Sequence, residues 1–419
     1  MKSDYSTYYT YQIKVVSRER VQVKKWDNRH QSLGEPAGVL RASHRERAAE
    51  LLKVARDNLL DNAGESRRLG EALFELLFDE VLGQDFVNFY YQVIQRERQI
   101  VRIELDIDEH LFPDLAAFPW EFLCLPQQMN LGTIWLGTDP HLVLSRRRSQ
   151  WIPAQPIRLK SREKLRIALA IAAPEDLAAV AYEKVETALE KLSQKSDLWE
   201  LIPTVNPATP EAIDEILERE PHLFHLIGHG RFENEDNRAI GQIALVDDLN
   251  EAMWVDADYF SELFNRHRPG VVMLQACEGG MLSASEAFVG VASRLVQQNI
   301  PVVVAMQYEV SNVTASRFSR CFYERLSRGE AVDIAAQEGR RAIALSPTQY
   351  RRRDFATPAI WMRVADGFLF GRSAPSKAEV NAPQTTGNTF QIYDSKIGEL
   401  AGSNIFHFTA NLDSDQPRS

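Results

Sequence analysis

From Lys164 to Leu345 the sequence alternates short apolar segments with amphipathic ones, and this pattern restricts the possible folds more than any other feature. The apolar segments predict strands at Leu165–Ala172, Trp199–Ile202, Leu223–Ile227, Ile243–Val246, Val271–Ala276 and Val302–Ala305. The amphipathic segments predict helices at Leu177–Leu192, Pro210–Glu218, Ala257–Phe264, Ser285–Gln297, Asn312–Ser327 and Ala331–Leu345. Such an alternation is typical of an α/β fold with a mostly parallel sheet flanked by helices.

The residues before this alternation predict a smaller lobe of mixed α+β type. Residues 8–25 alternate apolar and polar side chains, as a hairpin does, and three helices are expected between Arg45 and Arg98. Further strands are expected at Ile100–Asp106 and Leu142–Ser145, and Trp151–Lys160 has the composition of a junction. The expected domains are an N-terminal lobe (1–160), the α/β lobe (161–372), a linker (373–387) and a C-terminal tail (388–419).

Composition restricts the partners of the chain. Its 419 residues carry a net charge of −10, so we expect no nucleic-acid contact. The short basic runs Arg146–Arg148 and Arg351–Arg353 are expected to be solvated surface charges. No apolar run is long enough to span a bilayer, the first ten residues do not resemble a signal peptide, and three cysteines do not form a disulfide framework. We therefore expect a cytoplasmic protein without membrane contact.

Two residues that follow predicted strands carry the chemistry. His229 lies between Gly228 and Gly230, and Cys277 follows it by 48 residues. Sites in parallel sheets lie at the carboxyl ends of strands, and a thiol needs a nearby base to act as a nucleophile near neutral pH. We therefore predict His229 as the base and Cys277 as the nucleophile. The backbone amides of Gly230 and Cys277 would hold a developing oxyanion.

The remaining candidates have structural interpretations. His225 lies within its strand and is expected to be a packed or hydrogen-bonded histidine, while Cys124 and Cys321 are expected in the core. No His or Cys spacing predicts a metal site, and no Gly-rich phosphate loop is present, so we expect no metal and no cofactor.

The quoted residues resemble the CHAT peptidases, a bacterial family in the same clan as caspases and separases. The similarity rests on His225-Leu-Ile-Gly-His229-Gly230, on Gln275-Ala-Cys277-Glu278, on Gly290-Val-Ala with Ile300–Gln307, and on Phe118-Pro-Trp-Glu121. A Cys in Gln-Ala-Cys-x-Gly with a His about 50 residues upstream is also a caspase-type signature. The resemblance implies a caspase-like fold, with His229 as catalytic base and Cys277 as nucleophile.

Specificity depends on the neighbours of Cys277. Gln275 and Glu278 are the expected substrate-binding residues. Glu278 differs from the residues usual in caspases at that position, and relatives that cleave after Arg or Lys often have an acidic residue where this chain has Gln275. Other residues that could line the pocket are Asp236, Asp247, Asp248 and Asp256.

The C-terminal tail suggests how such an enzyme would be controlled. Residues 388–408 combine scattered Phe, Ile and Leu with Gly, Ser and Asn, and resemble short amyloid-like signalling motifs. The resemblance implies a cysteine endopeptidase of a bacterial defence or cell-death pathway. It would cleave a protein substrate and be activated by self-assembly or by an upstream sensor that binds the tail. The alternative is a non-catalytic caspase-like scaffold that works through this tail.

Overall fold

The structure is a computed structural model. It describes residues 8–56, 63–129, 131–148, 152–160, 163–235, 238–276, 283–308, 310–346 and 353–372. The chain divides into a large compact unit, Met1–Ala374, and a second unit, Pro375–Ser419. The predicted linker and tail lie outside the described residues, so their predicted roles stay predictions.

The secondary structure of the large unit follows the predicted alternation. Its strands are β1 (Tyr9–Ser17), β2 (Arg20–Trp26), β3 (Ser32–Gly34), β4 (Ala37–Val39), β5 (Val101–Asp106), β6 (Leu142–Arg146), β7 (Ile157–Leu159), β8 (Leu165–Ile171), β9 (Trp199–Leu201), β10 (Leu223–Gly228), β11 (Gly230–Glu235), β12 (Arg238–Val246), β13 (Ala252–Asp256), β14 (Val271–Ala276), β15 (Val302–Met306), β16 (Pro358–Met362) and β17 (Phe370–Arg372).

The helices alternate with these strands in the second half of the unit and cluster in the first. They are α1 (Ala42–Arg56), α2 (Ala63–Leu77), α3 (Glu80–Phe89), α4 (Pro113–Ala116), α5 (Glu183–Lys195), α6 (Pro210–Leu217), α7 (Ala257–Glu262), α8 (Ser283–Gln297), α9 (Asn312–Ser327) and α10 (Val332–Ala344). Helix α6 begins as predicted: the Thr209 hydroxyl accepts a hydrogen bond from the Ala212 amide at 3.1 Å, and Pro210 is the first helical residue.

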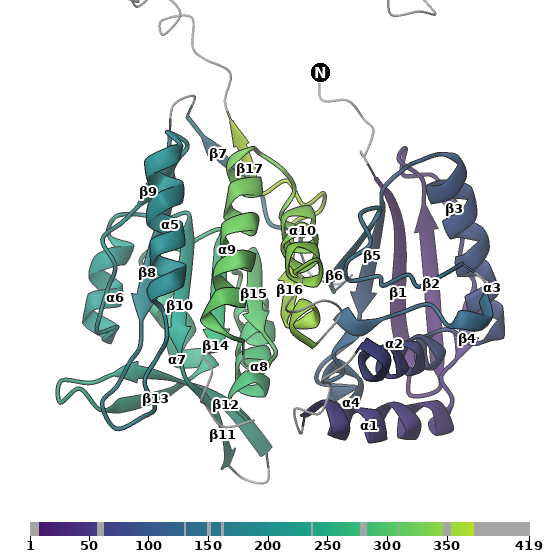
Figure 1. The fold of residues 1–419 in the computed structure, drawn as a ribbon, viewed down its shortest axis with the longest axis horizontal. Helices are drawn as coiled ribbons and strands as arrows, with labels where there is room; N and C mark the ends of the chain where they lie inside the picture. The colour runs from purple at the N-terminus through teal and green to yellow at the C-terminus, as the bar shows by residue number, and fades with distance from the viewer. Residues whose placement is uncertain are drawn as a thin grey trace, which may run out of the picture. The chain divides into compact units, whose positions relative to one another are not determined.

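One large sheet runs through the described residues (Figure 1). Its twelve strands there follow the order β3-β2-β1-β5-β6-β16-β15-β14-β10-β8-β9, with β4 paired to β2. Most neighbouring strands are parallel, and the antiparallel pairs are those of β2 with β1, β3 and β4 and that of β15 with β16. The predicted α/β fold with a mostly parallel, helix-flanked sheet is confirmed. Because β6 pairs with β16, the predicted lobes 1–160 and 161–372 share this sheet.

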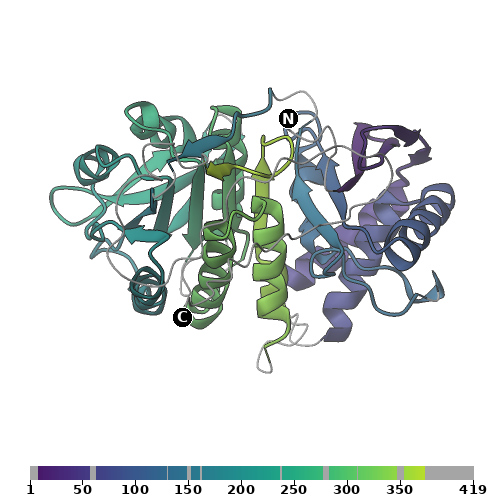
Figure 2. The ribbon, with the colours of Figure 1, turned by 90° about the horizontal axis from the view of Figure 1, so that it is seen from above.

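Both faces of the sheet are covered by helices, as Figures 1 and 2 show. Alternate residues of β14 point to opposite faces: Met273 belongs to the core under α5, α9 and α10, whereas Leu274 belongs to the core under α6, α7 and α8. This double burial is the reason that the strand sequences are almost continuously apolar.

The structure departs from the predicted elements mainly in short or edge segments. The junction contains β7, which pairs with β17, and β11, β12 and β13 form a separate antiparallel sheet. The predicted helix Leu177–Leu192 is wrong at its start, because α5 begins only at Glu183. The preceding loop is tied elsewhere: the Glu175 amide donates to the Asn250 carbonyl, and the Asp176 carboxylate accepts the Ala252 amide, both at 2.8 Å.

Candidate functional site

The candidate site lies where two neighbouring parallel strands end. β10 and β14 pair in register from Leu223 opposite Val271 to Gly228 opposite Ala276. His229 is the next residue after Gly228, and Cys277 is the next residue after Ala276. Cys277 and Glu278 lie outside the described residues. The nucleophile and substrate-binding roles predicted for them therefore stay predictions, but the register places the ends of the two strands side by side.

A backbone carbonyl holds the His229 ring. The side chain is 5% exposed, and its Nε2 lies 2.8 Å from the carbonyl oxygen of Ala178. A carbonyl can only accept, so Nε2 carries the hydrogen and donates it. In the neutral ring Nδ1 then has the free lone pair, which is the state that a general base requires.

Ala178 is a site residue that the sequence did not reveal. It belongs to the loop between β8 and α5, in a segment where the apolar spacing predicts helix. Its contribution is a main-chain oxygen, which any residue type supplies, so the sequence carries no signal for it. The hydrogen bonds of this loop to the turn before β13 keep it out of the helix.

Glycines on both sides of His229 have separate structural roles. A Cβ on Gly228 would lie 3.0 Å from the Cβ and 3.2 Å from the carbonyl oxygen of Ala172, the residue directly after β8, so the chain after β8 approaches the end of β10 closely there. Gly230 begins β11 opposite Ile243, and the Ala244 amide donates to the His229 carbonyl at 3.0 Å. Hydrogen-bonded and non-bonded residue pairs alternate along an antiparallel ladder. His229 and Ala244 form a hydrogen-bonded pair, so the next pair, Gly230 and Ile243, is non-bonded, and the Gly230 amide is directed away from β12. Its oxyanion role stays a prediction.

A buried hydrogen-bond chain joins the two strands that end at the site. His225 Nε2 lies 3.2 Å from Gln275 Oε1, and the Tyr323 hydroxyl of α9 lies 3.1 Å from His225 Nδ1. The amide oxygen accepts from Nε2–H, so the hydroxyl donates to Nδ1. Burial lowers the pKa of His225 to about 3, while the hydrogen bond to Gln275 opposes this shift. The expectation of a hydrogen-bonded His225 is confirmed.

The same hydrogen-bond chain includes Gln275, a predicted substrate-binding residue. Its side chain is 1% exposed and its amide oxygen is engaged by His225. Two of the alternative pocket residues bind backbone amides: Asp247 accepts from Leu249 and Glu251, and Asp256 caps α7. Asp236 lies outside the described residues. Substrate binding by any of these residues stays a prediction.

The other cysteines occupy structural positions. Cys124 is fully buried, as expected, whereas Cys321 on α9 is only partly buried. Burial raises the pKa of the Cys321 thiol, against the opposing effect of Arg325.

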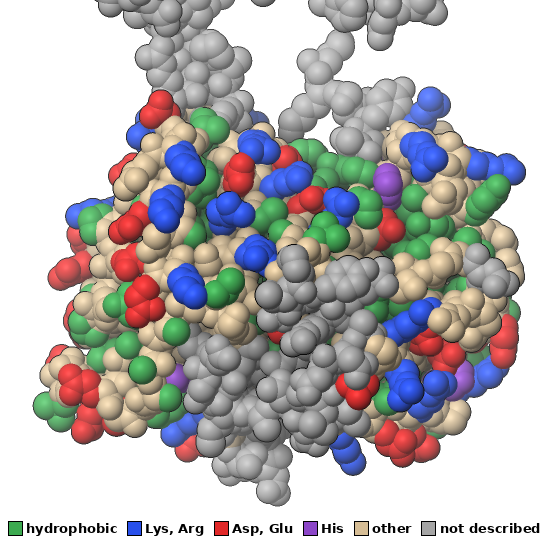
Figure 3. Space-filling view, in the orientation of Figure 1, with side chains coloured by type: hydrophobic (Ala, Val, Ile, Leu, Met, Phe, Trp, Pro, Cys, Tyr) green, Lys and Arg blue, Asp and Glu red, His purple; other side chains and the backbone are tan. Residues whose placement is uncertain are grey.

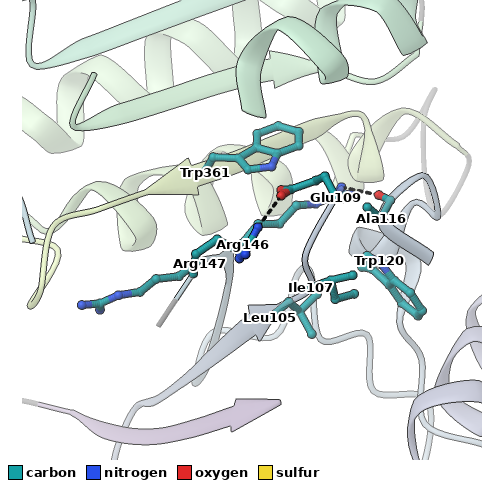
Figure 4. A pocket seen from close by; sticks show the side chains of 9 residues that line it. Leu105, Ile107, Glu109, Ala116, Trp120, Arg146, Arg147 and Trp361 are labelled. Carbon is teal, nitrogen blue, oxygen red and sulfur yellow. Dashed lines mark hydrogen bonds and ion pairs between the residues drawn. The ribbon is translucent and has the colours of Figure 1, made fainter. Parts of the chain in front are cut away.

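The Pro-Trp-Glu motif forms an ion-pair cluster inside the molecule. Arg146 forms two hydrogen bonds with the Glu121 carboxylate, at 2.8 and 3.1 Å, and Gln307 donates to the same carboxylate at 2.7 Å. The Arg146 guanidinium also lies 4.8 Å from the centre of the Trp361 ring, and both side chains line the hollow in Figure 4. Burial alone would raise the pKa of Glu121, but Arg146 reverses this effect and the pKa is lowered.

The expectation that Arg146–Arg148 are solvated charges is wrong for two of the three residues. Arg146 is 7% exposed and Arg148 5% exposed. Arg148 pairs with Asp106, Asp108 and Glu109. The run lies on and after β6, a central strand of the sheet, where acidic side chains on and after β5 compensate its charge. Of the second basic run, Arg351 and Arg352 lie outside the described residues.

No helix in the described part of the chain combines the length and apolar character needed to cross a membrane. No curated protein sequence matches the chain.

Solved structures with a similar arrangement are very distant in sequence. A chain of the Saccharomyces cerevisiae separase–securin complex is 12% identical with a TM-score of 0.46, over 86% of this chain and 30% of that one. The Porphyromonas gingivalis complex of RgpB pro- and mature domains gives 12% identity and a TM-score of 0.42, over 76% of this chain and 77% of that one. The present chain thus spans less than a third of the yeast chain.

A protein-family comparison finds a match over most of the sequence. The CHAT domain matches residues 67–371, which run from α2 to β17 and include both strand ends of the candidate site. Since this match covers well over half of the 419 residues, the chain belongs to the CHAT domain family.

Proposed function

We propose that this chain is a cysteine endopeptidase in which His229 and Cys277 act as base and nucleophile. The observation that carries the proposal is the hydrogen bond from His229 Nε2 to the Ala178 carbonyl, at the end of a strand in register with the one that leads to Cys277. This bond leaves Nδ1 as the proton acceptor.

The chemical steps follow from that tautomer. His229 Nδ1 takes the thiol proton of Cys277, and the thiolate attacks the scissile carbonyl to form a tetrahedral intermediate. The amides of Gly230 and Cys277 hold its oxyanion. The carbon–nitrogen bond then breaks, and the imidazolium returns the proton to the leaving amine. Water hydrolyses the acyl-enzyme and restores the thiol.

The wider role that we propose is in a bacterial defence or cell-death pathway in the cytoplasm. Membership of the CHAT domain family supports the peptidase activity. The composition of residues 388–408 supports activation through the tail, by self-assembly or by a sensor that carries a like segment. Gln275 and Glu278 are proposed to contact the substrate residue beside the cleaved bond.

Two measurements test the proposed chemistry. Cys277→Ala should abolish cleavage of a peptide library and labelling by an iodoacetamide-type probe, because it removes the nucleophile. His229→Ala should also slow labelling of Cys277, since the thiol loses its base. The matched control is Cys321→Ala, which removes a half-buried thiol and should change neither readout. Cleavage by Cys277→Ala at the wild-type rate would refute the proposal, and equally slow labelling of all three cysteines would favour the scaffold.

A further inference from the structure

A long groove lies between α5 and α9, on the helical face that Figure 3 presents. The space in and over it, open solvent included, amounts to about 1660 Å³. Its walls come from these two helices and from residues that follow their ends, namely Ser196 and Leu198 after α5 and Arg328 after α9. None of its lining residues belongs to the candidate site, so the site leaves the groove unexplained.

The groove carries cations that have no carboxylate partner in the described structure. Lys184, Lys191, Lys195 and Arg320 are exposed, and none of them forms an ion pair with a described residue. The two acidic residues of the lining are already engaged: Glu183 accepts from Asn312 at 3.3 Å, and Glu324 pairs with Arg328. Figure 3 shows Lys and Arg side chains gathered over this face. On a chain with net charge −10, the groove is a local concentration of the opposite sign.

Apolar side chains lie between these cations. Leu198 is 36% exposed and Val313 46% exposed, and Ala188 and Leu192 are partly buried beside them. An exposed apolar strip inside a groove is a feature of surfaces that receive an amphipathic segment. The lining contains no aromatic residue on which nucleic-acid bases could stack.

We propose that this groove binds an acidic, amphipathic segment of a partner protein. Asp and Glu side chains of the segment would face the four unpaired cations, and its apolar side chains would cover Leu198 and Val313. Opposite charges at the rim speed association, and the apolar contacts stabilise the complex. The proposal is independent of the catalytic chemistry and goes beyond it.

The test uses the full chain carrying Cys277→Ala, so that the probe is not cleaved. The probe is a fluorescein-labelled peptide of about 16 residues, with Leu and Glu on opposite faces of a helix. Fluorescence anisotropy should show binding that weakens as salt is raised. Adding Lys191→Glu and Arg320→Glu should weaken it by about tenfold or more, because two attractive contacts become repulsive.

The matched control is the pair Lys53→Glu and Arg68→Glu, which makes the same change in net charge on α1 and α2. These two residues are also exposed, and neither forms an ion pair with a described residue. Absence of peptide binding, or an equal loss in the control pair, would overturn the proposal. Tighter binding of single-stranded DNA or of phosphatidylserine vesicles, lost with Lys191→Glu and Arg320→Glu, would also overturn it by assigning the groove to another class of ligand.

Discussion

His225 links the stability of the protein to pH, because it is fully buried and stays neutral. Burial lowers its pKa to about 3, far below the ordinary value of about 6.5. Above pH 6.5 neither the folded nor the unfolded chain binds a proton at this residue. Between about 6.5 and 3 only the unfolded chain does, so the free energy of unfolding falls as the pH drops through this window.

His225→Asn should make that dependence shallower. At pH 7.5 the variant should lose about 1–3 kcal/mol, because the Tyr323–His225–Gln275 hydrogen-bond chain is broken inside the core. Between pH 6.5 and 4.5 the unfolding free energy of the variant should fall less steeply than that of the wild type. The two slopes should differ by about 1.4 kcal/mol per pH unit. Urea unfolding at several pH values measures both effects. His110→Asn, at an exposed position, is the control. An unchanged slope in His225→Asn would refute the assignment of this pH dependence to His225.

Helix α8 packs closely against β12, and one glycine makes the approach possible. A Cβ on Gly241 would lie 2.7 Å from the carbonyl oxygen of Ala287, too short for any relaxed contact. The position of a Cβ is fixed by the backbone of residue 241, and the oxygen belongs to the backbone of Ala287, so the sheet of β11–β13 and the helix would have to separate. β11 begins directly after His229, and α8 begins six residues after Cys277.

Gly241→Ala should therefore impair both stability and labelling of Cys277. We expect a loss of about 1–3 kcal/mol in unfolding free energy, as for other overpacked positions, and slower reaction with the iodoacetamide-type probe. Gly290→Ala is the matched control on α8: a Cβ there meets nothing within 4 Å, and alanine favours a helix by up to about 1 kcal/mol. If the two variants label alike, the close packing of β12 on α8 has no effect on the site.

The sequence correctly predicted the strands that are buried on both faces. It missed the features that depend on hydrogen bonds between residues far apart in the sequence. β10 and β14 are buried on both faces, so their apolar runs identified them and the residues at their ends. The start of α5 was wrong because Leu177 and its neighbours have helical spacing while the loop binds the turn near Asn250. The hydrogen bond of Ala178 follows from that loop. Amphipathic spacing reports burial and cannot report which backbone oxygen faces an imidazole.

The same limit holds for the molecule as a whole. The run of three arginines predicted that Arg146 is solvated, and this prediction was wrong. The side chains that bind the Arg146 guanidinium come from distant parts of the sequence: Glu121 is 25 residues away and Gln307 is 161 residues away. Glu121 and Arg146 lie before the predicted boundary at residue 160, and Gln307 lies after it. The cluster and the shared sheet therefore predict that both predicted lobes unfold together.

Glu121→Gln should destabilise both predicted lobes at once. It removes one partner of a buried ion pair and leaves the Arg146 charge uncompensated, which costs about 3–5 kcal/mol. Hydrogen exchange read by mass spectrometry should then speed up both in β1 and β5 and in β10 and β14. Glu80→Gln is the control, because its pair with Arg41 is exposed and worth little. Faster exchange confined to β1 and β5 would contradict the prediction, since the cluster would then stabilise only the N-terminal strands and the lobes would unfold separately despite their common sheet.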